Sequence, residues 1–68
     1  MIWLVLNNES HQIISCNIFN GDNIHQLWVT RPNGKNLKVV ESNKEEAIRE
    51  IKDAIDFAIE QGFTTVSI

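Results

Sequence analysis

Apolar and polar residues alternate along the first part of the chain, and this predicts β-strands. The first apolar run, at residues 2–6, has no polar position at all, which is typical of a strand buried on both faces. Segments rich in Asn, Gly and Pro separate the runs, and these residue types favour turns. The pattern therefore predicts an antiparallel meander of four strands, at residues 2–6, 11–19, 24–30 and 37–41.

The period changes after the fourth predicted strand and indicates one long amphipathic helix at about residues 43–61. Its apolar residues recur every three or four positions: Ala47, Ile48, Ile51, Ala54, Ile55, Ala58 and Ile59. Ser42 and Glu45 have the spacing of a capping box, and Gly62 is expected to end the helix. Alternation returns at residues 63–68 and predicts a last strand.

The lengths of the two later turns fix which residues share a face of the sheet. Both turns place six residues on the face that the helix is expected to cover: Ile14, Cys16, Leu27, Val29, Leu37 and Val39. The first turn leaves open whether Trp3 or Leu4 points to the core. We expect a single α+β domain over residues 1–68, of the order ββββαβ, with the last strand beside the first and antiparallel to it. The alternative leaves the first strand unpaired.

One helix covers only one side of such a sheet, so apolar residues are expected on the other side. This predicted contact face contains Ile13, Phe19, Ile24, Trp28, Lys38, Val40 and Phe63, with Lys38 across from Trp28. A contiguous apolar patch of this size is typical of a protein interface. Because small domains often gain stability by association, we expect a homodimer, with a foreign protein as the alternative partner.

The charge of the chain bears on nucleic-acid binding. A formal net charge of −3 and a pI near 5.1 do not favour attraction to phosphate backbones by the overall field. Three cations nevertheless gather around one turn, namely Arg31, Lys35 and Lys38. They are the basis of our alternative hypothesis, a weak nucleic-acid-binding module.

Catalytic chemistry has a narrow basis in this sequence. Cys16 is the only cysteine, so no internal disulfide can form, and mid-strand cysteines are usually inert. A Cys16–His25 pair is the one nucleophilic arrangement that the predicted hairpin allows. We find no metal-ligand spacing and no nucleotide- or cofactor-binding motif, and we predict a non-enzymatic protein without a cofactor. The apolar N-terminal run is too short for a signal peptide or membrane span, so we expect a cytoplasmic location.

The segment from Glu41 to Ala47, which leads to Asp53-Ala54-Ile55, resembles the strand-to-helix junction of HicB-like antitoxins. Many small βββαβ proteins, including phage-encoded inhibitors of host enzymes, have a similar junction. The chain lacks the HicB family's Pro/Gly-rich third strand and its appended DNA-binding domain, so the resemblance implies only a small regulatory protein that acts by binding. A phage or mobile-element origin is our hypothesis from size and composition.

Overall fold

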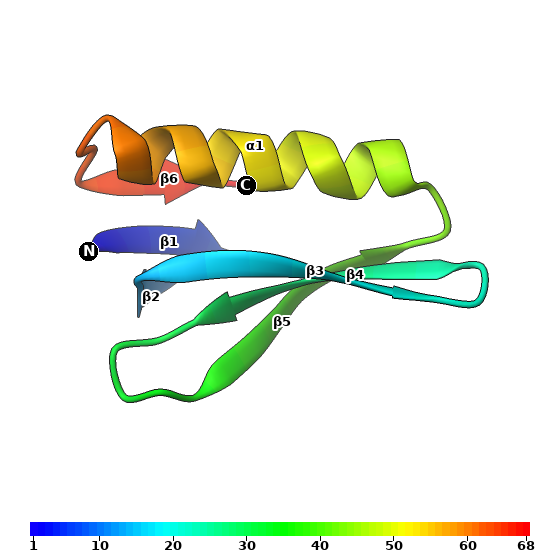
Figure 1. The fold of residues 1–68 in the computed structure, drawn as a ribbon. Coiled ribbons are helices and arrows are strands. Elements are labelled where there is room, and N and C mark those ends of the chain that lie inside the picture. The colour runs from blue at the N-terminus through cyan, green and yellow to red at the C-terminus, as the bar shows by residue number, and fades with distance from the viewer.

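Five strands, and not four, precede the helix in the computed structural model, which describes residues 1–68. The elements are β1 (Ile2–Leu6), β2 (Glu9–Ile13), β3 (Ser15–Gly21), β4 (Ile24–Thr30), β5 (Asn36–Ser42), α1 (Glu45–Glu60) and β6 (Thr65–Ser67) (Figure 1). The predicted class is confirmed: an α+β fold in which an antiparallel meander packs against one long helix and a final strand follows.

The predicted second strand is divided by a bend at Ile14. The strands before and after the bend belong to different three-stranded sheets, with the orders β2-β1-β6 and β3-β4-β5. The backbone N–H of Ile14 donates to the carbonyl of Thr30 at 2.9 Å, which ties the bend to the end of β4. The bend also changes the phase of the alternation, because Ile13 and Cys16 are both buried although they are three positions apart.

The last strand pairs with β1, as predicted, but it runs parallel to β1 and not antiparallel. The division at Ile14 adds one strand to the meander, and with it one change of direction. This reverses the expected orientation of β6 relative to β1. Figure 1 shows β6 beside β1, beneath the end of the helix from which it emerges. The first strand is therefore central in its sheet, as its apolar sequence suggests. The prediction that both of its faces are buried is wrong, because Trp3 is 42% exposed.

The first turn settles the orientation of β1. Asn7 and Asn8 both have positive φ, as the residues of a tight two-residue hairpin turn do. This turn places Leu6 opposite Glu9, and it leaves Leu4 in the core and Trp3 on the outside.

The second hairpin turns one residue later than we expected, around Asp22 and Asn23. A turn centred on Gly21 and Asp22 would have put Cys16 opposite Leu27; Cys16 instead lies opposite Val29. Moving a turn by one residue moves each pairing by two, so Cys16, Leu27 and Val29 still face the core. The prediction that Ile14 shares this face is wrong, because Ile14 lies at the bend and is 46% exposed. The third hairpin has the predicted pairs Val29–Leu37 and Trp28–Lys38.

A β-bulge interrupts the third hairpin between Leu27 and Trp28, so that Leu27 pairs with Val40 and not with Val39. Both valines are half-buried against the core. A bulge adds one residue to a strand and brings neighbouring side chains to the same side.

The helix begins differently from the prediction. Its N-cap is Lys44, which makes no side-chain capping bond, and the Ser42 hydroxyl accepts from the Lys44 N–H at 3.0 Å instead. The prediction of a capping box is therefore wrong. Glu45 is free to pair with Arg49, whose Nε donates to Oε1 of Glu45 at 2.9 Å.

The helix ends as predicted, at Gly62 with a φ of +73°. The N–H of Gly62 donates to the carbonyl of Ile59, and the N–H of Phe63 donates to that of Ala58. These two bonds define a Schellman motif. The Phe63 ring then packs edge-to-face on Phe57, with ring centroids 5.9 Å apart, as the residue after such a motif commonly does.

The core lies between α1 and the inner faces of the two sheets. It contains nine buried residues: Ile2, Leu4, Ile13, Cys16, Leu27, Val29, Ile48, Ile55 and Ala58. No buried side chain in this core carries a charge. The helix is not of the length and apolar character needed to cross a membrane.

Candidate functional site

The side of β3-β4-β5 that faces away from the helix is the candidate contact surface. We call it the outer face, and it contains Phe19, Ile24, Gln26, Trp28, Lys38 and Glu41. Alternation along each strand places these side chains opposite the buried Cys16, Leu27 and Val29. Four residues that the sequence predicted for the contact face are therefore together: Phe19, Ile24, Trp28 and Lys38.

Two aromatic rings form the apolar part of the outer face. Phe19 and Trp28 are diagonal neighbours on β3 and β4, with ring centroids 6.3 Å apart and an edge-to-face angle of 76°. Phe19 is 61% exposed, and Ile24, which follows the turn between β3 and β4, is exposed as well. An exposed pair of this geometry offers a large rigid apolar contact.

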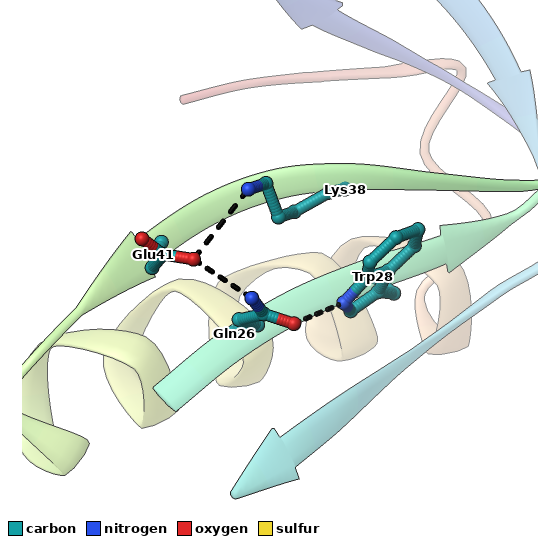
Figure 2. A network of polar contacts seen from close by, with 4 residues as sticks. All are labelled: Gln26, Trp28, Lys38 and Glu41. Carbon is teal, nitrogen blue, oxygen red and sulfur yellow. Dashed lines mark hydrogen bonds and ion pairs between the residues drawn. The ribbon is translucent and has the colours of Figure 1, made fainter. Parts of the chain in front are cut away.

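A polar network holds Trp28 in place, as Figure 2 shows. The indole N–H of Trp28 donates to Oε1 of Gln26 at 3.0 Å, and Nε2 of Gln26 donates to Oε1 of Glu41 at 2.7 Å. Lys38 Nζ lies 3.4 Å from the same carboxylate oxygen. The bond from Gln26, followed by the charge of Lys38, lowers the pKa of Glu41. The network therefore keeps Glu41 ionised and fixes the orientation of the indole.

Three residues predicted for the contact face lie elsewhere. Ile13 is 0% exposed, because the bend at Ile14 turns it into the core, and Ile14 is 46% exposed in its place. Val40 is turned inward by the bulge. Phe63 is half-exposed against Phe57 at the end of the helix, where it serves the Schellman motif. Two adjacent isoleucines, Ile13-Ile14, were the sequence signal that the alternation breaks there.

The three cations of the alternative hypothesis do not form one free basic patch. Lys38 is paired with Glu41 on the outer face. Arg31 is half-buried beside a surface hollow, while Lys35 is exposed. The Lys35 carbonyl accepts from the Arg31 N–H at 2.9 Å, which closes the turn between β4 and β5. Nucleic-acid binding through these residues stays a prediction.

Cys16 is held as a neutral thiol. Its Sγ lies 3.1 Å from Oδ1 of Asp56 on α1, to which it donates, and Asp56 also forms an ion pair with Lys52. Burial, then the bond and charge of Asp56, raise the pKa of Cys16 to about 12. Because only a thiolate is a strong nucleophile, this environment does not favour nucleophilic chemistry.

The two histidines have other partners. His25 pairs along the strands with Asn20 and Ser42, and its Nδ1 lies 2.7 Å from Oδ1 of Asn20. The Cys16–His25 pair that the predicted hairpin allowed is therefore not formed. His11 is in β2, and its Nε2 lies 3.4 Å from a Glu9 carboxylate oxygen. No group of three or more His, Cys, Asp or Glu side chains is placed to hold a metal ion.

One surface hollow, which the sequence did not indicate, lies where β2 meets the β4–β5 turn. It is lined by Ser10, His11, Gln12, Arg31, Pro32 and Asn33. The two segments are distant in sequence and meet only because the chain bends at Ile14.

Comparison of the chain with protein-family models, with curated protein sequences and with solved structures finds no match. The resemblance of the strand-to-helix junction to HicB-like antitoxins thus gains no support from these comparisons.

Proposed function

We propose that this protein acts by binding, and that the outer face is its interface with a second copy of itself. The single observation that carries the proposal is the Phe19–Trp28 pair, in which Phe19 is exposed and the half-buried Trp28 is held in place by the Gln26–Glu41 network. Aromatic residues are enriched at the centres of interfaces, and those that are ordered before binding lose little entropy on association.

The composition of the outer face favours a second copy over a partner of one charge. A two-fold axis brings the same surface to both sides of an interface, so a face with one sign of charge would repel itself. The outer face has one cation and one anion, Lys38 and Glu41, 3.4 Å apart. Each can therefore meet its opposite on the other copy, around a common aromatic centre.

The size of the core supports the same proposal. Only nine residues are buried, while large apolar side chains remain exposed on several elements. Small domains without disulfides or metals commonly gain stability by association. The state of Cys16 supports binding over thiol catalysis, since its proton is retained well above neutral pH.

The test is the absolute mass in solution by size-exclusion chromatography with light scattering, over a range of concentrations. We expect the wild-type chain to be a dimer and Trp28→Glu to be a monomer with an unchanged circular dichroism spectrum. Truncation of a central interface aromatic typically costs about 2 kcal/mol or more, and a buried charge costs further energy. The dimer dissociation constant should then rise by more than about 30-fold.

Trp3→Glu is the matched control, because Trp3 is the other tryptophan of the chain and is 42% exposed on the other sheet. It should leave the dimer intact. A monomeric wild-type chain, or a dimer that Trp3→Glu dissociates and Trp28→Glu does not, would refute the assignment.

A further inference from the structure

The hollow between β2 and the β4–β5 turn differs from the outer face in its chemistry. Its volume is about 320 Å³, and none of its lining residues is hydrophobic. A site of this kind does not suit an apolar ligand, which needs apolar walls. It suits a small ligand that is recognised through hydrogen bonds and charge.

Arg31 is the cation of this hollow, and no carboxylate neutralises it. Three of the six cations of the chain are in ion pairs with Asp or Glu, namely Lys38, Arg49 and Lys52. Lys35 and Lys44 are unpaired but fully exposed to water. Arg31 alone is both half-buried and unpaired, in a chain whose net charge is −3.

The buried part of Arg31 is also unsatisfied. Its Nε lies below the molecular surface and has no hydrogen-bond acceptor in the protein. Leaving a charged donor without an acceptor in the protein is costly, and such a group in a native structure needs an explanation such as a water, an ion or a functional role. The hollow is lined by this side chain and is large enough to hold a small anion.

The other walls supply further donors. Ser10 has a hydroxyl group, and Gln12 and Asn33 have side-chain amides. Oδ1 of Asn33 already accepts from the Lys35 N–H at 3.0 Å, so the amide nitrogen of Asn33 is its remaining polar group. Glu9 does not line the hollow; its exposed carboxylate lies 3.4 Å from His11.

We propose that this hollow binds the phosphate group of a small polar molecule, with Arg31 as the charged anchor. A phosphate has three terminal oxygens, so it can accept from Arg31 and from donors on both walls at once, whereas a carboxylate would be satisfied by the guanidinium fork alone. A nucleic-acid backbone would need a row of free cations, but Lys38 is engaged by Glu41.

The experiment is a titration of the ¹⁵N-labelled protein with inorganic phosphate, followed by the amide resonances. We expect saturable shifts confined to the amides of Ser10, His11, Gln12, Arg31 and Asn33, since Pro32 has no amide proton. Arg31→Gln should weaken binding about tenfold or more, because hydrogen bonds to a charged group contribute about 1.5–3 kcal/mol. Arg31→Lys keeps the positive charge but loses the forked guanidinium group. Its affinity for phosphate should lie between that of the wild-type chain and that of Arg31→Gln.

Lys35→Gln is the matched control, since it removes one positive charge from the same turn but not from the hollow. It should change the affinity less than about twofold. An equal loss of phosphate affinity in Arg31→Gln and Lys35→Gln, or amide shifts that do not saturate, would overturn the proposal. Tighter binding of acetate, or of a single-stranded oligonucleotide, than of phosphate would also overturn it and would assign the hollow to that class of ligand.

Discussion

The two faces of β3-β4-β5 are built from neighbouring residues of the same strands, yet they have opposite properties. On the inner face, Leu27 and Val29 are completely buried, and the one polar group, the Cys16 thiol, has a partner in Asp56. On the outer face, the half-buried Gln26 and Trp28 alternate with them, and they are part of a polar network and an aromatic pair.

The difference shows how one strand serves two purposes. Burial of branched aliphatic side chains stabilises the fold through apolar surface removed from water. The outer face contributes little of that burial, so its aromatic rings and its ordered hydrogen bonds are available for contact with another molecule. Substitutions on the inner face should therefore act on folding, and those on the outer face on association.

The largest effect is expected from Leu27→Ala on the inner face. Loss of a fully buried leucine costs about 2–5 kcal/mol. The free energy of unfolding of a domain this small is expected to be on the order of 5 kcal/mol, so the variant should keep only about 0–3 kcal/mol of it, and at the largest loss about half of the protein is unfolded at room temperature. The measurement is urea unfolding followed by circular dichroism, at a fixed protein concentration.

Gln26→Ala is the outer-face counterpart of this variant, one position away on the same strand. Its loss of stability should stay at about 1–2 kcal/mol, since the variant removes two hydrogen bonds, one exposed and one partly buried. If both variants lose the same amount, the two faces do not differ in the way we describe.

An intermediate effect is expected from alkaline pH, through Cys16. Its pKa is raised to about 12 from an ordinary value of 9.0. The stabilisation is therefore fully present below pH 9 and is lost as the pH rises from about 9 towards about 12, where the unfolded chain releases the thiol proton first. The free energy of unfolding of the wild-type chain should fall more steeply over this range than that of Cys16→Ala. Parallel slopes for the two proteins would show that the thiol is not protected.

The smallest effect is expected on the pKa of Glu41. This pKa reports whether the polar network of the outer face is formed in solution. The bond from Gln26 and the charge of Lys38 lower the pKa of this carboxyl group. Its stabilising contribution is present above the ordinary pKa and is lost as the pH falls through the lowered one. A ¹³C NMR titration should find the Glu41 pKa raised in both Gln26→Ala and Lys38→Gln. If it stays unchanged in both, the network does not persist in solution.

Much of the fold follows from local patterns. The alternation from Ile24 to Thr30 and the helical spacing behind Lys44 each predict one element, because each depends only on neighbouring residues. Gly62 ends the helix because positive φ suits glycine. The pairing of Trp28 with Lys38 follows from the length of one turn. Alternation and turn length together are enough to place Phe19, Ile24, Trp28 and Lys38 on one face.

The tertiary structure decided what depends on contacts between distant segments. At the bend at Ile14, β2 pairs with β1 and β3 pairs with β4. The adjacent Ile13-Ile14 indicates locally that the alternation breaks, but it does not specify the division into two sheets. The bend buries Ile13, makes β6 parallel to β1 and brings His11 near Arg31. The bulge that turns Val40 inward likewise responds to packing under the helix. Local patterns are thus enough for the helix, the last strand and most of the central hairpins, because these depend on neighbouring residues. The fifth strand, the division into two sheets and the polar hollow depend on contacts between segments that are distant in the sequence.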